Sequence, residues 1–331
     1  MLNGEKGGVF CCRQRYNSGE QQKEQVLAII NSIALHGLEG TVVKVEVDVS
    51  SGMPAYDLVG LPDTAVRESR ERVRTAIKNS GFEFPVKRIT VNLAPADIRK
   101  EGPEYDLPIA IGILLASGQI VVDSGLDHIF MGELSLNGNI KQIRGALPAA
   151  LSVKKYKYES MIVPKANAVE AAVVKDVKVY LASSLAELVE SLNKGDLKPY
   201  VVDIKNISSD DMNNNIPDFA DVKGQVAAKR ALEIVAAGGH NIFMLGSPGS
   251  GKTMLARCLS GILPNFTFDE SVEVTQIYSL AGLIKPNQSL VVPRPFRLPH
   301  HSASTASIVG GGRIPRSGEI SLEHNAVLFL R

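Results

Sequence analysis

The segment "NIFMLGSPGSGKTMLARCLSG", residues 241–261, constrains the fold more than any other part of the chain. A short apolar run leads into a glycine-rich loop that matches the pattern G-x-x-x-x-G-K-[ST], and a helical pattern follows. The loop residues are Gly246, Ser247, Pro248, Gly249, Ser250, Gly251, Lys252 and Thr253. The segment therefore predicts strand, loop and helix in an α/β domain.

This loop has the chemistry of a phosphate-binding site. Glycines let the backbone wrap a phosphate chain with its N–H groups pointing inward, and the N-terminus of the following helix favours negative charge. We expect Lys252 to reach the β- and γ-phosphates of ATP and the Thr253 hydroxyl to be a ligand of Mg²⁺. The alternative is a glycine-rich turn that binds nothing, which the flanking strand and helix patterns disfavour.

Charge and cysteine content narrow the classes of protein. The net charge is +1, so a nucleic-acid surface would have to be a local patch. Cys11, Cys12 and Cys258 form no CxxC pair, which fits the reducing cytoplasm. The apolar stretch 107–116 is too short to cross a bilayer. These features predict a cytoplasmic protein without a membrane partner.

The chain of 331 residues divides into about two domains. Residues 1–25 are polar and aperiodic, so we expect them to be disordered. Residues 26–200 mix strand and helix patterns in one α/β domain. Residues 201–217 crowd Ser, Asp and Asn together and predict a linker. The second domain covers residues 218–331.

Several elements of the first domain can be predicted from periodicity. Val43, Val45, Val47 and Val49 alternate with charged residues in a half-buried strand. Residues 62–80 read as a helix and 106–117 as a buried helix. Asn137-Gly138 predicts a hairpin. Further helices are expected at 144–155 and at 184–192, the latter closed by Gly195. Strands are expected at 88–93, at "SMIVP" and at "VKVYLA".

Longer stretches resemble a known family. The segment "FADVKGQVAAKRALEIVAAGGHNIFMLGSPGSGKTMLAR" is similar to the entry to an AAA+ module, and "RPFRLPHHSASTASIVGGGRIPRSGEISLEHNAVLFL" resembles the Mg-chelatase-like AAA+ proteins of the ComM/YifB group. The stretch "VGLPDTAVRESRERVRTAIKNSGFEFPVKRITVNLAPADIRKEGPEYDLPIAIGIL" is similar to the first domain of that group. The resemblance implies a Lon-protease-like α/β domain followed by a P-loop AAA+ domain of α/β/α architecture.

The resemblance also implies an activity and partners. Members of the group are expected to assemble as rings, hexamers above all, and to act as ATP-driven motors on DNA in transformation and branch migration. Two alternatives stay open: an ATPase of the magnesium-chelatase type that remodels a metal-insertion partner, and a non-catalytic nucleotide-binding remnant. Val222, Gly224 and Gln225 lie where the family brings backbone against adenine.

The first domain departs from the proteolytic Lon pattern. Where Lon proteases have the serine of their serine–lysine dyad, this chain has Glu104, and Leu147 occupies the position of the lysine. A carboxylate cannot replace the activated hydroxyl, and a leucine cannot act as a base. We therefore expect a degenerate domain that acts as a scaffold or an interaction domain, and no proteolysis.

A second departure concerns the Walker B acids, an Asp-Glu pair that follows the "AVLFL" strand in the family. Here Arg331 follows Leu330. We therefore expect a truncated, incomplete AAA+ domain that binds ATP without turnover and has no assignable catalytic residue after Leu330. Because family members begin near the sequence that starts here at Val26, we also expect residues 1–25 to be a spurious extension.

Basic residues are the remaining candidates for function. Arg313 and Arg316 lie in a glycine-rich loop that corresponds to pore-facing loops of related modules, and we expect them to contact DNA. One predicted helix contains four arginines, Arg67, Arg70, Arg72 and Arg74, together with Glu68 and Glu71. They form either a solvated, ion-paired face or a contact with DNA or another subunit.

Two other candidates have a structural interpretation. For His300-His301 we favour a polar network over a metal site, and for Cys258 a packed side chain over a redox centre.

Overall fold

The computed structural model divides the chain into two compact units. Unit 1 comprises Met1–Val202 with Lys285–Asn287, and unit 2 comprises Asp203–Ile284 with Gln288–Arg331. The structure describes residues 12–13, 26–121, 127–202, 217–285, 288–311 and 316–330. The predicted linker 201–217 and the predicted disordered segment 1–25 therefore lie mostly outside the described residues.

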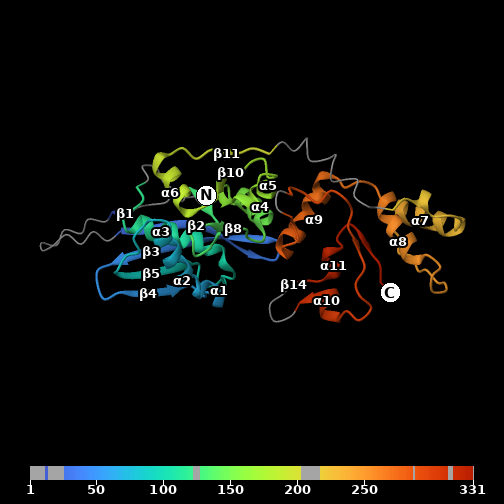
Figure 1. Ribbon diagram of the computed structural model, residues 1–331, viewed down its shortest axis with the longest axis horizontal. Coiled ribbons are helices and arrows are strands. Elements are labelled where there is room, and N and C mark those ends of the chain that lie inside the picture. Colours follow the sequence, from blue (N-terminus) through green and yellow to red (C-terminus); the bar gives the residue numbers. More distant parts are fainter. Residues whose placement is uncertain are drawn as a thin grey trace, which may run out of the picture. The chain divides into compact units, whose positions relative to one another are not determined.

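Unit 1 is built on one mixed sheet of nine strands (Figure 1). Its order is β11-β10-β9-β6-β2-β3-β5-β4, and β1 pairs with β2. The pairs β2–β6, β6–β9, β9–β10 and β4–β5 are parallel, and the other pairs are antiparallel. The strands are β1 (Cys12–Arg13), β2 (Val26–His36), β3 (Glu39–Ser50), β4 (Ala55–Val59), β5 (Arg88–Ala94), β6 (His128–Phe130), β9 (Ser160–Pro164), β10 (Lys178–Ala182) and β11 (Pro199–Tyr200).

The hairpin of β2 and β3 forms the centre of this sheet. Its register runs from Leu27 opposite Asp48 to His36 opposite Glu39, and Gly37 supplies the positive φ of 58° that the two-residue turn needs. The four alternating valines of β3 are all buried, which confirms the predicted strand. The register comes from the period-two pattern, because a slip by one residue would place these valines on the other face.

Helices pack against both faces of the hairpin. In α3 (Asp106–Ala116), Gly112 lies so close to Val47 that an added Cβ would be 2.6 Å from its Cγ2 atom. In α4 (Ala146–Lys155), the Ser152 hydroxyl accepts a hydrogen bond of 2.9 Å from the Gly40 N–H. Val47 and Gly40 are seven positions apart on β3 and so face opposite sides of the sheet. The α/β class expected for the first domain is thereby confirmed.

The helices of unit 1 largely follow the predicted boundaries. Ser184 caps the N-terminus of α6 (Leu185–Lys194) by accepting from the Glu187 N–H at 3.3 Å, and Gly195 ends this helix in the left-handed conformation. The predicted hairpin is formed by β7 (Glu133–Leu134) and β8 (Ile140–Lys141). The other elements are α1 (Thr64–Arg67), α2 (Ser69–Asn79), η1 (Pro103–Tyr105), η2 (Lys165–Asn167), α5 (Ala168–Ala171) and α6 (Leu185–Lys194).

One prediction for the first domain was wrong in detail. The single helix expected over 62–80 is broken at Glu68 into α1 and α2. At this break Arg72 Nη2 donates to the Ala65 carbonyl at 2.9 Å, so a side chain supplies a donor to the backbone there. Within the segment expected to be disordered, Cys12 and Arg13 pair antiparallel with the start of β2.

Unit 2 consists of helices with short strand pairs. Among its described residues, β12 pairs parallel with β15 and β13 pairs antiparallel with β14. With its helices, its short strand pairs and its glycine-rich loop, unit 2 belongs to the expected P-loop α/β class. The elements are η5 (Phe219–Asp221), α7 (Val226–Gly238), α8 (Lys252–Ile262), α9 (Phe268–Ala281), β12 (Phe296–Arg297), α10 (Thr305–Val309), β13 (Gly310–Gly311), β14 (Arg316–Ser317), α11 (Glu319–Leu322) and β15 (Val327–Leu328).

Two strands expected in unit 2, one before the glycine-rich loop and one near the end of the sequence, are absent or shortened in the structure. Residues 241–245 form no strand, and Phe243 and Leu245 are 89% and 90% exposed. The apolar run "AVLFL", which reads as a buried strand, forms only the half-buried pair Val327–Leu328 of β15, and Leu330 is exposed. An apolar run becomes a strand only where a neighbouring strand supplies backbone partners, and among the described residues none pairs with 241–245.

Candidate functional site: the glycine-rich loop before α8

The loop 246–253 leads directly into α8, as the sequence predicted for the helix. Gly249 and Gly251 have φ values of 81° and 83°, the left-handed region that glycine adopts at little cost. Gly251 is the N-cap of α8, so the chain turns sharply and enters the helix at Lys252. The first N–H groups of any helix lack intrahelical acceptors, and here they face an exposed glycine-rich loop.

Lys252 folds back across this loop. Its Nζ donates to the carbonyls of Gly246 and Ser247 at 2.8 and 2.9 Å and to the Ser250 hydroxyl at 3.2 Å. The ammonium group therefore lies at the centre of the loop, held by three oxygen atoms, while its side chain remains only partly buried. Lys252 is the single cation of the loop, and these contacts hold its ammonium group where it would contact an anion bound by the loop.

The base of the site is a small core between α7 and α8. Val222, Leu232, Leu255, Cys258 and Leu259 pack together there, and Cys258 is completely buried. Its Sγ lies 3.5 Å from the Asp218 carbonyl, and burial raises the pKa of the thiol. Cys258 is thus a packed side chain, as predicted, and it fixes the helix that carries Lys252 and Thr253.

The donor set of the loop fits a magnesium nucleotide. The loop offers backbone N–H groups and an ammonium, which are groups that bind phosphate oxygens. Thr253 occupies the second position of α8 and is partly buried beside the loop, where its hydroxyl is a hard oxygen ligand suited to Mg²⁺. No carboxylate belongs to residues 246–253, so nothing in the loop repels an anion.

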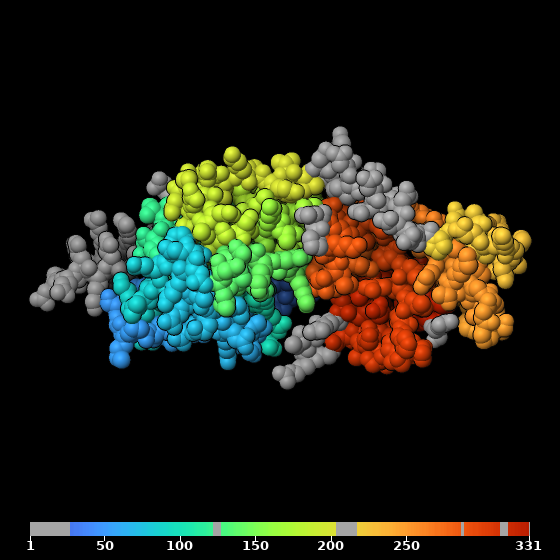
Figure 2. Space-filling model, viewed as in Figure 1, coloured from blue at the N-terminus to red at the C-terminus, as the bar shows by residue number. Residues whose placement is uncertain are grey.

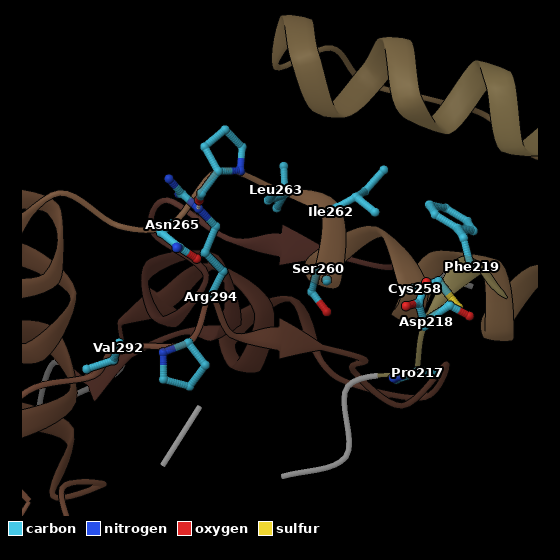
Figure 3. Close-up of a pocket in the computed structure, with 13 residues that line it drawn as sticks. Pro217, Asp218, Phe219, Cys258, Ser260, Ile262, Leu263, Asn265, Val292 and Arg294 are labelled. Atoms are coloured by element: carbon cyan, nitrogen blue, oxygen red, sulfur yellow. Dashed lines mark hydrogen bonds between the residues drawn. The ribbon is translucent and has the colours of Figure 1, made fainter. Parts of the chain in front are cut away.

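A cavity of about 380 Å³ lies at the other end of α8 (Figure 3). Phe219 and Cys258 lie at one end of it, and Asn265 and Arg294 at the other. Lys252 and Ile262 are the first and last of the eleven residues of α8, so about 15 Å of helical rise lies between them. No residue of the loop 246–253 lines this cavity, so it is a separate feature from the phosphate-binding loop.

Arg294 at this cavity has a structural role. Its Nε donates to the Pro264 carbonyl and its Nη1 to the Asn325 carbonyl, each at 2.5 Å. Nη2 lies 3.4 Å from the Glu270 carboxylate, and the guanidinium lies 4.4 Å from the centroid of the Phe266 ring. Because all three nitrogens of the guanidinium and one of its faces make contacts, Arg294 joins the segments around the cavity.

The positions that correspond to the Lon dyad are chemically unlike a dyad. Leu147 is completely buried in α4. Burial above all, together with the nearby carboxylates of Asp63 and Asp106, raises the pKa of Glu104 to about 8. Sequence reasoning missed Lys100, whose side chain is completely buried and donates to the Pro95 carbonyl. Burial lowers the pKa of Lys100, a signal that no local pattern carries.

The arginines of the α1–α2 segment serve different purposes. Arg72 makes a bidentate ion pair with the buried Asp106, at 2.8 and 3.0 Å. Arg70 lies 3.6 Å from Glu71 and over the Tyr56 ring, and Arg74 lies over the Phe84 ring. The expected solvated, ion-paired face therefore describes Arg70 in part and is wrong for Arg72.

The remaining candidates are placed as follows. Arg313 and the side chain of Arg316 lie outside the described residues, so their role stays a prediction. The His300 ring lies 4.2 Å from the His301 ring, and its Nδ1 lies 2.7 Å from the Ser302 hydroxyl, a local polar contact. Val222 is buried in the core beside α8, and Gly224 and Gln225 both adopt positive φ before α7.

Among the described residues no helix has the length and apolarity needed to cross a membrane.

Comparison with known proteins identifies relatives of both units. A family model described as subunit ChlI of Mg-chelatase matches residues 45–167, and one described as magnesium chelatase, subunit ChlI, matches residues 218–331. The chain is 47% identical to the competence protein ComM of Haemophilus influenzae over 305 residues, 92% of this chain and 60% of that protein. It is 44% identical to the uncharacterized protein YifB of Escherichia coli, over 92% of this chain and 59% of that protein.

A more distant likeness is to a Lon protease. The chain is 26% identical to Lon protease 2 of Bacillus subtilis over 171 residues, 46% of this chain. The chain spans about 60% of the length of the ComM and YifB relatives. Taken with its Lon-like α/β unit and its P-loop before α8, the chain belongs to the Mg-chelatase-like AAA+ family that includes ComM and YifB.

Proposed function

We propose that this chain binds ATP with Mg²⁺ at residues 246–253 and is part of an ATP-driven DNA motor of the ComM type. The observation that carries the proposal is the position of Lys252 Nζ, held inside the glycine-rich loop at the N-terminus of α8. The family uses nucleotide and magnesium in general, which supports the same assignment.

Each group of the loop has a defined task in this proposal. The backbone N–H groups of residues 246–251, except Pro248, which has none, bind the phosphate oxygens, and the N-terminal dipole of α8 favours their charge. Lys252 leaves the carbonyls of Gly246 and Ser247 and turns to the β- and γ-phosphates. Thr253 supplies its hydroxyl to Mg²⁺, which neutralises phosphate charge when bound.

The proposal includes partners and organisation beyond the loop. Residues 26–200 are assigned as the Lon-like scaffold, without proteolysis because of Glu104 and Leu147, and residues 218–331 as the AAA+ part. DNA is the substrate, contacted in part by Arg313 and Arg316, and the assembly is a ring, a hexamer above all. The location is the cytoplasm. The competence name of the Haemophilus relative supports the DNA role.

Equilibrium binding tests the proposal directly. A fluorescent ATP analogue is titrated into the 331-residue chain with and without Mg²⁺, first alone and then with a saturating single-stranded oligonucleotide. We expect saturable, magnesium-dependent binding, and an affinity that changes when DNA is present, because ligands of one motor are thermodynamically coupled. A folded chain that shows no nucleotide binding would contradict the assignment.

A second candidate is an ATPase of the magnesium-chelatase type. It is favoured by the description of both matching family models as subunit ChlI. The same titration separates the two candidates. A chelatase-type ATPase binds the nucleotide with an affinity that DNA does not change, whereas its affinity responds to a metal-insertion partner.

A further inference from the structure

A small notch on unit 1 lies apart from the nucleotide loop. Its volume is about 130 Å³, and it is formed by the start of β4, one face of α2 and the turn before β5. These segments belong to the blue-to-cyan part of the chain, which Figure 2 shows at the surface. The residues that line this basic notch are Pro54, Ala55, Tyr56, Arg70, Arg74, Lys78, Phe84, Pro85, Val86 and Lys87.

The charge of the basic notch has one sign. Four cations and no carboxylate line it. Arg70, Arg74 and Lys78 follow one another at intervals of four residues on α2, so they lie on one face of the helix and span about 12 Å. All three side chains are exposed, and so is Lys87 on the opposite rim. An anion that spans this row would meet several cations at once.

This row of cations is not explained by the stability of the fold. Like charges four residues apart on a helix repel each other and destabilise it. Arg70 has Glu71 at 3.6 Å, but in the part of the chain that the structure describes no salt bridge is found for Arg74, Lys78 or Lys87. The chain as a whole has a net charge of only +1, so the cluster is a local feature. The repulsion is relieved when a polyanion binds.

Two aromatic rings hold the arginines of the notch in place. The Arg70 guanidinium lies 5.6 Å from the centroid of Tyr56, and that of Arg74 lies 6.0 Å from the centroid of Phe84. A guanidinium that rests on a ring keeps its outer face free, and nucleic-acid bases stack on such faces and on the rings themselves. Val86, 81% exposed at the rim, adds an apolar surface.

We infer that the basic notch is a binding site for single-stranded DNA, with the phosphates along the α2 cations and a base against the Arg–aromatic pairs. A cavity of about 130 Å³ is too small for a complete small-molecule ligand, but it suits a single base of a strand that continues on both sides. The three helix cations cover the backbone of about three nucleotides. This inference rests on the DNA role proposed above and assigns it a contact surface.

The test compares two variants of equal charge change. R74A/K78A/K87A removes three cations of the notch, and K155A/K165A/K175A removes three exposed lysines that do not line it. Binding of a fluorescent oligothymidine to the full chain is measured by anisotropy between 50 and 200 mM salt. We expect the notch variant to bind at least tenfold more weakly and to lose about 2 from the slope of log K against log salt, since each phosphate contact contributes about 0.7. The control variant should keep the slope of the wild type.

A third variant tests stacking separately from charge. Phe84→Leu keeps an apolar side chain and every cation, and we expect it to weaken oligothymidine binding about fivefold without changing the salt slope. Circular dichroism and ATP-analogue binding establish that each variant is folded.

The possible outcomes separate the inference from the proposed function. If the wild type binds oligothymidine and both triple variants bind it equally well, the inference is overturned and the proposed function stands. If the wild type binds ATP but no DNA, the DNA role itself fails. A notch variant that alters only the oligomeric mass would assign the surface to a protein contact and overturn the inference.

Discussion

Arg72 on α2 and Asp106 at the start of α3 form a bidentate ion pair, with Nε to Oδ2 at 2.8 Å and Nη2 to Oδ1 at 3.0 Å. The carboxylate is completely buried, and its Oδ2 also accepts from the Leu134 N–H at 3.2 Å. Burial raises the pKa of Asp106 to about 6 although Arg72 lowers it. This pair therefore joins two helices and the β7–β8 hairpin at a position where each partner needs the other.

Removing one partner of this pair should destabilise unit 1. We expect Arg72→Ala to lower the free energy of unfolding by about 3 kcal/mol, because an unpaired carboxylate remains buried. The double substitution Arg72→Met with Asp106→Leu should recover more than half of that loss, since it leaves no buried charge. Urea denaturation followed by circular dichroism measures both. A double variant less stable than Arg72→Ala would contradict this explanation.

Glu104 should make stability depend on pH. Its folded pKa is about 8, above the ordinary value of 4.5, so the folded state holds a proton that the unfolded state releases between these pH values. The contribution of this group to stability is therefore fully present below pH 4.5, is lost as the pH rises from 4.5 to about 8, and stays constant above that. Each unit of pKa corresponds to about 1.4 kcal/mol.

The corresponding variant is Glu104→Gln, which is neutral at every pH. Between pH 5 and pH 8.5 we expect it to lose much less stability than the wild type, and to be the more stable of the two at pH 8.5. Glu101→Gln, an exposed neighbour, serves as the control and should follow the wild-type profile. Parallel profiles for the wild type and Glu104→Gln, measured by urea denaturation, would show that this carboxyl does not carry the effect.

Lys252→Ala tests the nucleotide site. We expect the affinity for a fluorescent ATP analogue to fall at least tenfold, because the single ammonium of the loop is lost. The side chain is only partly buried and its contacts are within the loop, so the thermal midpoint should change by only a few degrees. Lys223→Ala removes an exposed lysine of the same unit and should bind as the wild type does. If Lys252→Ala and Lys223→Ala bind the ATP analogue with equal affinity, Lys252 does not contribute to nucleotide binding.

Gly251 tests the backbone of the loop. An added Cβ meets no atom within 4 Å, so Gly251→Ala is opposed by its φ of 83° alone. A left-handed residue with a Cβ costs about 1 to 2 kcal/mol, and the entry into α8 should distort to avoid it. We expect weaker binding of the ATP analogue, with partial recovery in Gly251→Asn because asparagine tolerates this conformation better than alanine. An alanine variant that binds like the wild type would show that the turn is not required.

Cys258 tests the core under the site. Its thiol is completely buried among Val222, Leu232 and Leu255, so Cys258→Ser places a more polar group there and should cost about 1 to 3 kcal/mol. Cys258→Ala leaves a smaller apolar group and should cost less. In a C11S/C12S background, a thiol reagent should react with Cys258 only as the protein unfolds. Rapid reaction in the folded state would contradict the packed assignment.

Predictions that rest on neighbouring residues in the sequence were the accurate ones. The valine alternation of β3, the Ser184 and Gly195 caps of α6, the hairpin at Asn137-Gly138 and the helix after the glycine-rich loop are all found in the structure. Each depends on a period or on a backbone preference that acts over a few residues, so it can be read without knowing what packs against it. The same local density of motifs identified the family.

Only the tertiary structure decided the properties that depend on residues far apart in the sequence, namely strand pairing, ion pairing and the lining of the basic notch. The run 241–245 has the composition of a strand, yet strand formation needs hydrogen-bonding neighbours, and the described residues supply none. Four arginines of one segment looked alike in sequence, but Asp106, 34 residues from Arg72, makes one of them structural. The basic notch joins Tyr56, α2 and Lys87 only through folding. Charge, burial and pairing are set in three dimensions, because electrostatic energies depend on distance and solvent, which the order of residues does not contain.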